Sequence, residues 1–216
     1  MNLPEEAVTR RARSLEILAR EAVPFMPQLP VIETSTEIAP RSKEEIAYRT
    51  HSLLTVALKG EGLSQPIVKR ILQERSLKNY LTQKELAFIE NSDPSQHERI
   101  QFSWRYECVW VLLWALGYIE ELNRPERHCD VGRIITIMKE PTNDEFIARA
   151  CQRPLSEILD AADLIYRYHW AVVSTRLRGE PAPARLDKGV VMERHHALNW
   201  LIRYMDQDWD DISTDT

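Results

Sequence analysis

The sequence predicts an all-α protein: an irregular multi-helix bundle of about eight helices around a buried, Trp-rich central helix, with an extended Pro-rich N-terminal segment. Three observations predict this class. Apolar residues recur at helical spacing along most of the chain. Four times a Ser or Thr is followed three residues later by Glu, just ahead of apolar residues, which is the pattern of a capping box. The 12 Pro residues cluster and so mark the ends of helices.

The first predicted helix covers residues 4–22, where Val8, Ala12, Leu15 and Leu18 share one face. A helix cannot continue through the stretch that follows, because proline lacks the amide proton and clashes with the preceding turn.

That stretch contains Pro24, Pro27, Pro30 and Pro40. We expect it to run extended over the surface, with one short strand around residues 29–33.

The middle of the chain contains the four capping boxes, in which a hydroxyl and a carboxylate each satisfy a free amide at a helix start. They are Ser42 with Glu45, Thr82 with Glu85, Ser95 with Glu98, and Thr142 with Glu145. Ser64 is predicted to cap a further helix, and the helix opened by Ser42 is expected to stop at residues 60–62. The β-branched run 134–138 can form either a helix or a strand.

Three longer helices are predicted at residues 96–118, 155–178 and 188–205. The first is apolar on every side from residue 109 to residue 116, which is typical of a helix buried at the centre of a protein. The loop 179–183, with two Pro and one Gly, separates the second helix from the third.

Length and composition fit one structural domain with three parts. These are an N-terminal helix and Pro-rich segment (1–40) packed on the body, a helical body (41–205) and an acidic tail (206–216). The tail holds five Asp and no Lys or Arg, which accounts for the whole formal net charge of −5. A body without net charge makes nucleic-acid binding unlikely to be the function.

Three Cys without CxxC spacing argue against disulfides and a thiolate zinc site. No apolar run approaches the roughly 20 residues of a membrane span, and the first residues lack the pattern of a signal peptide. The sequence therefore predicts a cytoplasmic protein without membrane contact. It contains no GxGxxG, Walker, GxSxG or HExxH motif, so no cofactor and no metal site is predicted.

Two charged residues fall on predicted apolar faces. Glu107 shares a face with Val111 and Trp114, and Arg194 lies among Val190, Val191, Ala197, Leu198 and Leu201. Arginine keeps its charge in any protein environment, so it needs a carboxylate or several carbonyl groups. We expect Arg194 to bind an acid on another helix, namely Glu107, Asp163 or Asp160.

A stripe on the 155–178 helix combines Asp160, Asp163, Arg167 and Ser174. Asp163 and Arg167 are an i,i+4 pair in the stabilising order. The stripe is either a solvated ion-pair face or one wall of a cleft that faces Arg194.

His169 lies on the opposite, apolar side of the same helix and is expected in the core. His195 is expected at an apolar edge, with His196 and Asn199 pointing outward. Adjacent histidines on a helix diverge by about 100° and cannot share a metal ion.

The tail resembles the start of an EF-hand loop but lacks its Gly at the sixth position and its twelfth residue. We expect a docked tail instead, with Trp209 as its apolar anchor and with Asp208 and Asp210 reaching Arg side chains or helix N-termini. Weak capture of a metal ion by these Asp residues is the alternative.

Six segments stand in a characteristic order: Arg41-Ser-x-Glu44-Glu45-Ile-Ala; Trp104-x-x-Glu107 with Leu113-Trp-Ala-Leu-Gly117; Arg153-x-x-x-Glu157-Ile-Leu-Asp160; Asp163-Leu-x-Tyr166-Arg167-x-His169-Trp170-Ala; Glu193-Arg194-x-x-Ala-Leu-Asn199-Trp200-Leu; and Asp208-Trp-Asp210. Together they resemble the bacterial domain-of-unknown-function family 4272. The resemblance runs from about Arg41 to the C-terminus and implies no activity, cofactor or catalytic residue. It does imply that several polar residues belong together. The candidate polar centre is Glu107, Asp160, Asp163, Arg167, His169, Glu193, Arg194 and Asn199.

Two functions follow from these observations. The first, which the sequence favours, is a non-catalytic helical module that acts through a protein partner or through self-association. The second is a pocket that binds a small molecule or a metal ion, with hydrolysis of a bound substrate as one form of this function. The pocket would be lined by Glu107, Asp163, His169 and Arg194. The second requires those four side chains to converge on a cavity that a ligand can enter.

Overall fold

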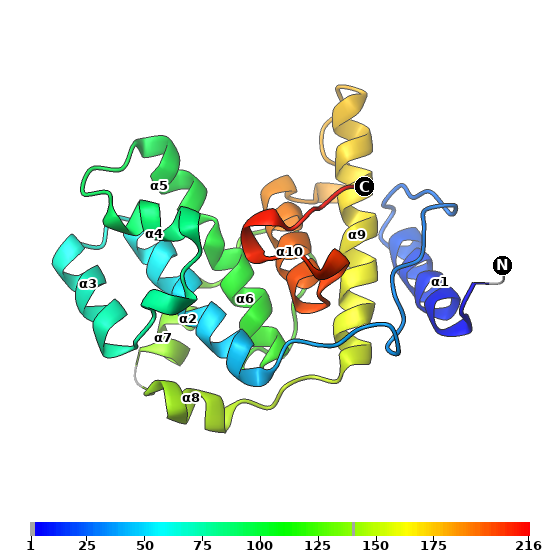
Figure 1. Cartoon of the computed structure of the whole chain (residues 1–216). Helices are drawn as coiled ribbons and strands as arrows, with labels where there is room; N and C mark the ends of the chain where they lie inside the picture. Colours follow the sequence, from blue (N-terminus) through cyan, green and yellow to red (C-terminus); the bar gives the residue numbers. More distant parts are fainter. Residues whose placement is uncertain (1–2, 140) are drawn as a thin grey trace.

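The computed structural model describes residues 3–139 and 141–216, and within these ranges it contains helices and no strand (Figure 1). The all-α prediction is therefore confirmed. The α-helices are α1 (Glu5–Arg20), α2 (Lys43–Gly60), α3 (Gln65–Glu74), α4 (Gln83–Glu90), α5 (Gln96–Ser103), α6 (Arg105–Ala115), α7 (Val131–Met138), α8 (Asn143–Arg149), α9 (Leu155–Leu177) and α10 (Lys188–Leu201).

Local sequence sets most helix starts. All four capping boxes form with both of their hydrogen bonds, at the N-termini of α2, α4, α5 and α8. Ser64 precedes α3 as expected, but its side chain makes no capping hydrogen bond. The run 134–138 belongs to helix α7, whose start is capped by Asp130.

Two predicted helices had wrong bounds, and one predicted strand was wrong. The helix expected at 96–118 is divided at Trp104, where the amide of Glu107 bonds to the Trp104 carbonyl three residues back instead of four. Such a tighter turn interrupts the α-helical ladder. The third long helix ends at Leu201, because Arg203 takes a left-handed conformation with φ of +50°. No strand forms at residues 29–33, which run as turn and irregular chain.

The core forms where α6 packs between α2 and α10, and α10 in turn packs on α9 (Figure 1). Every residue of α6 from 108 to 115 is buried, which agrees with its apolar character on all sides. Helix α1 packs on the far side of α9. Residues 23–42 contain no helix and run from α1 across α9 to α2 (Figure 1).

None of the helices within the described ranges combines the length and the apolar character that a membrane crossing requires.

Candidate functional site

The ion pair between Arg194 of α10 and Glu107 of α6 lies in the core. The Nε of Arg194 donates to Glu107 Oε2 at 3.1 Å, and the two residues are 4% and 2% exposed. A buried charge is very costly unless it is paired and hydrogen-bonded. Here each of the two charges supplies the partner that the other needs.

The same pair fastens the loop 116–130, which connects α6 to α7. Arg194 Nη1 donates to the carbonyl groups of Leu122, at 2.7 Å, and Asn123, at 3.1 Å. The second oxygen of Glu107 accepts the amide of Cys129 at 2.6 Å. Arg194 and Glu107 therefore join two core helices and one long loop.

Arg194 also borders a cavity of about 640 Å³ beneath this loop. Charges of both signs line the cavity: Arg124, Arg127, Arg133 and Arg194, with Glu120, Glu121 and Asp130. Because these charges nearly balance and Glu107 already neutralises Arg194, the cavity has no clear preference for a ligand of either sign.

Asp163 and Arg167 are both fully buried, and two hydrogen bonds of 2.8 Å join them. Arg167 Nη2 also donates to the carbonyl of Pro30 at 3.3 Å. The pair thus lies under the Pro-rich segment. For Asp163 and Arg167 both predictions were wrong, because this buried pair is neither solvated nor directed at Arg194.

Asp160, one turn earlier on the stripe, lies near α1. Its carboxylate accepts from Arg13 Nη2 at 2.6 Å and is 3.3 Å from Arg10 Nε. The stripe therefore fastens α1 and the Pro-rich segment to α9, which is a structural role.

His169 and His195 form a buried contact between α9 and α10. Their Nδ1 atoms are 2.8 Å apart, so the N–H of one ring donates a hydrogen bond to the ring nitrogen of the other. Burial, with a contribution from Arg176, lowers the pKa of His169 to about 4. Burial and the neighbouring rings of His169 and His196 hold the pKa of His195 well below its usual value. Both histidines are thus neutral at pH 7.

Glu193 lies on another side of α10 and contacts α6. Its carboxylate accepts from Arg105 Nη1 at 2.7 Å and from the thiol of Cys108 at 3.1 Å. Burial raises the pKa of Cys108 far above its usual value, and the charge of Glu193 adds to this effect. The thiol therefore stays protonated.

The four side chains predicted to line one pocket do not converge. Glu107 and Arg194 meet at the loop 116–130, Asp163 lies under the Pro-rich segment, and His169 contacts His195. The structure instead divides the predicted centre into separate pairs on different sides of α9 and α10.

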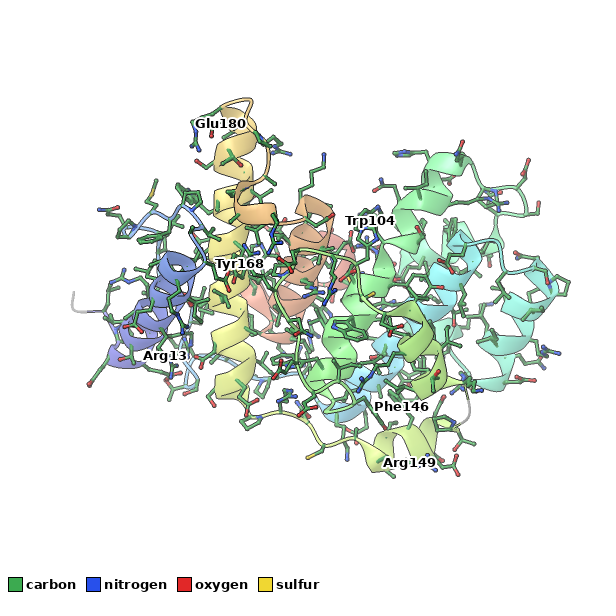
Figure 2. The ribbon with its side chains drawn as sticks, turned by 180° about the vertical axis from the view of Figure 1, so that it is seen from behind. Arg13, Trp104, Phe146, Arg149, Tyr168 and Glu180 are labelled. Atoms are coloured by element: carbon green, nitrogen blue, oxygen red, sulfur yellow. The ribbon has the colours of Figure 1, made fainter. Side chains whose placement is uncertain are left out.

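His169 lines a second cavity, of about 450 Å³, which we call the α9–α10 cavity. It lies beside Trp104, at the junction of α5 and α6, and extends toward Glu180, in the loop after α9. Figure 2 labels both residues. Its apolar walls come mainly from Trp104, Val172, Val173 and Met192. Small-molecule sites typically combine apolar walls with polar groups that orient the ligand.

Four charged side chains also line the α9–α10 cavity. Glu193 is paired with Arg105, and Glu180 accepts from Arg178 at 2.9 Å. Arg176 and Lys188 have no carboxylate partner in the part of the chain that the structure describes. The cavity therefore combines apolar walls with two available cations.

The wall at Trp104 requires a glycine at position 189, because a Cβ there would overlap the indole ring. We expect Gly189→Ala to lower the free energy of unfolding by about 1–3 kcal/mol through overpacking, as measured by urea denaturation. Gly132→Ala, on the exposed face of α7, is the matched control and should change stability by less than about 1 kcal/mol. Equal effects of the two changes would contradict the tight contact.

Asn199, His196 and the tail form a further group of contacts. Asn199 is buried and donates to the Ser213 carbonyl at 2.9 Å, and the ring of His196 is 4.7 Å from that of Trp209. The outward direction predicted for His196 and Asn199 was thus wrong, because the tail covers this face of α10.

Trp209 is 4% exposed and packs edge-on against Trp200, with 5.4 Å between the rings. Asp210 accepts the first-turn amide of Lys84 in α4 at 3.3 Å, a helix N-terminus. The carbonyl of Asp208 accepts the amide of Asp211 in a short 3-10 turn.

Sequence reasoning missed several residues of these sites. Arg176 and Lys188 gave no signal, since an exposed cation next to a helix end is common, and Trp104 appeared only among the residues of the family resemblance. The buried pair of Arg49 and Glu85 was also missed. Glu85 was already explained as a capping residue, and its carboxylate serves both roles.

Within residues 3–139 and 141–216, no group of three or more His, Cys, Asp or Glu side chains is placed to hold a metal ion.

One protein-family model, described as Domain of unknown function (DUF4272), matches residues 10–212 of the 216. The match includes most of α1, which lies ahead of the segments that carry the sequence resemblance. No curated protein and no solved structure matches the chain.

Proposed function

The chain belongs to the DUF4272 family, and on this premise we propose that it is a non-catalytic binding module that holds a small amphipathic anion in the α9–α10 cavity. The observation that carries the proposal is a pair of cations beside apolar walls, Arg176 and Lys188, for which the described residues supply no carboxylate partner. An apolar ligand body would be removed from water by these walls, while its anionic group would meet the two cations.

The polar groups in and near the α9–α10 cavity support binding rather than reaction. His169 is neutral at pH 7, because burial lowers its pKa to about 4, so it offers a hydrogen bond without a charge. The Cys108 thiol near Glu193 stays protonated through burial, which raises its pKa and removes its nucleophilic character.

Sodium decanoate is a suitable test ligand, with decanol and acetate as its apolar and charged halves. We expect decanoate to raise the melting temperature and to bind more tightly than either half in calorimetry at pH 7. The double variant Arg176→Gln and Lys188→Gln should weaken decanoate binding roughly tenfold, since each partly exposed ion pair contributes about 0.2–1 kcal/mol. Decanol binding should not change.

Two further variants separate this site from the rest of the surface. Val173→Trp narrows the α9–α10 cavity and should abolish binding of both decanoate and decanol. Arg133→Gln removes a cation from the other cavity and should have no effect. Decanoate binding that is equally strong in the wild type, the double variant and Val173→Trp would contradict the proposal.

A further inference from the structure

The tail segment, residues 207–213, is held in a well-defined seat on the body. Trp209 and Ile212 are its buried residues. The Trp209 ring lies between Trp200 and His196, and the guanidinium of Arg49 stands 5.0 Å from its centre. We use the name seat for the surface formed by Arg41, Arg49, Lys84, His196, Asn199 and Trp200.

Hydrogen bonds fix the register of the tail segment in the seat. Arg41 Nη2 donates to the Gln207 carbonyl at 3.3 Å, and Lys84 Nζ donates to the Asp210 carbonyl at 3.0 Å. Asn199 binds the Ser213 carbonyl near the end. The seat therefore recognises this segment along its whole length, through both its backbone and its indole ring.

The connection to the tail segment is strained. Between the end of α10 and Gln207, three residues that are not glycine have positive φ: Arg203 at +50°, Met205 at +53° and Asp206 at +53°. L-residues disfavour this region because Cβ approaches the backbone carbonyl. Met205 is 68% exposed, so packing of its side chain does not compensate for the strain.

We propose that two copies of this chain exchange their tail segments, so that each tail occupies the seat of the other copy. The backbone contacts of the tail segment with Arg41, Lys84 and Asn199 would be the same as in one chain. The hinge, residues 203–206, would extend over roughly 14 Å and its left-handed residues would relax, while Ile202 would stay in the core. Because the exchange is reciprocal, it produces a closed two-fold dimer.

The fit of the folded-back tail also leaves polar atoms unsatisfied. Trp209 Nε1 and His196 Nε2 are buried and have no hydrogen-bond partner among residues 3–139 and 141–216, although the two rings are in contact. An extended hinge allows a small shift of that ring and so gives the indole N–H access to the imidazole nitrogen.

Light scattering coupled to size-exclusion chromatography, over a range of protein concentrations, tests the exchange. We expect a monomer–dimer equilibrium in the full-length chain. Deleting Met205 and Asp206 shortens the hinge, prevents folding back and should give a dimer at every concentration. Changing Met205 and Asp206 together to Gly relieves the strain at these two residues, keeps the ion pair of Arg203 with Glu45 and should shift the equilibrium toward the monomer by at least tenfold.

A mixing experiment identifies the tail as the exchanged element. One copy carries Trp209→Ala, which disables its tail and leaves its seat intact. The other carries Trp200→Ala and Lys84→Glu, which damage its seat and leave its tail intact. We expect each to be monomeric alone and the mixture to form heterodimers, with circular dichroism verifying that both copies are folded.

The outcomes distinguish exchange from its alternatives. A full-length chain and a hinge-deletion variant that are both monomeric up to millimolar concentration would overturn the proposal. A dimer that survives deletion of residues 207–216 would also overturn it, because that dimer uses another surface. Heterodimers in the mixture, together with an obligate dimer of the hinge-deletion variant, would support it.

Discussion

Replacing Arg194 with Met is expected to lower the free energy of unfolding by about 3–5 kcal/mol. The change leaves the carboxylate of Glu107 buried without its cation, and it leaves the carbonyl groups of Leu122 and Asn123 without their donor. Urea denaturation followed by far-UV circular dichroism measures the loss. Arg133→Met, at an exposed position, is the control and should change stability by less than about 0.5 kcal/mol.

A double-variant cycle tests whether the pair itself causes this effect. Glu107→Met alone should be similarly destabilising, whereas the double change to Met should cost clearly less than the sum of the two, because it leaves no unpaired charge. If the effects of the two single changes simply add, the two residues do not interact. That result, or a decrease in the free energy of unfolding below about 1 kcal/mol for Arg194→Met, would contradict a major role of this pair in stability.

The second large effect is a loss of stability in mild acid. Burial lowers the pKa of His51 and His196 to about 3 and that of His169 to about 4, and it lowers that of His195 as well. Below pH 6.5 the unfolded chain takes up protons at these residues, and the folded chain does not. The free energy of unfolding therefore falls as the pH decreases from 6.5 toward 4.

The expected slope is up to about 1.4 kcal/mol per pH unit for each buried histidine, over the window between its unfolded and folded pKa. Urea denaturation at pH 7.5, 6.5, 6.0 and 5.5 measures it, in a range where carboxyl groups of ordinary pKa hardly titrate. Urea concentrations at the unfolding midpoint that stay constant over this pH range would contradict the buried neutral state of the histidines.

A pair of single variants assigns the effect to burial. His51→Leu removes a histidine that packs on Phe146 and whose Nε2 has no partner among the described residues. It should reduce the slope by the contribution of one buried histidine, up to about 1.4 kcal/mol per pH unit. His97→Gln changes an exposed histidine and should leave the slope unchanged. A slope that responds equally to both would assign the acid sensitivity to general charge effects.

How far the sequence could be interpreted depended on the range of the interactions involved. The capping boxes predicted the starts of α2, α4, α5 and α8, because each box closes within four residues. The sequence also predicted that Arg194 binds an acid, since a permanent positive charge on an apolar face needs a carboxylate or several carbonyl groups. Which acid would meet it remained open among Glu107, Asp163 and Asp160.

The errors arose where distant segments cover a face. Asp163 and Arg167 looked like a solvated pair, and only the crossing of the Pro-rich segment buries them. His196 and Asn199 looked exposed until the tail was seen to cover them. The break at Trp104 likewise accompanies a tertiary contact, in which its ring packs on Gly189.

The sequence by itself determined the all-α class, the starts of the capped helices and the apolar character of α6, because these depend on interactions between residues a few positions apart. Only the tertiary structure decided the pairing of Glu107 with Arg194, the contact of His169 with His195 and the α9–α10 cavity. These features require helices far apart in the chain to meet at specific angles and heights. Helical periodicity indicates which face of a helix is buried, but not which other segment covers it.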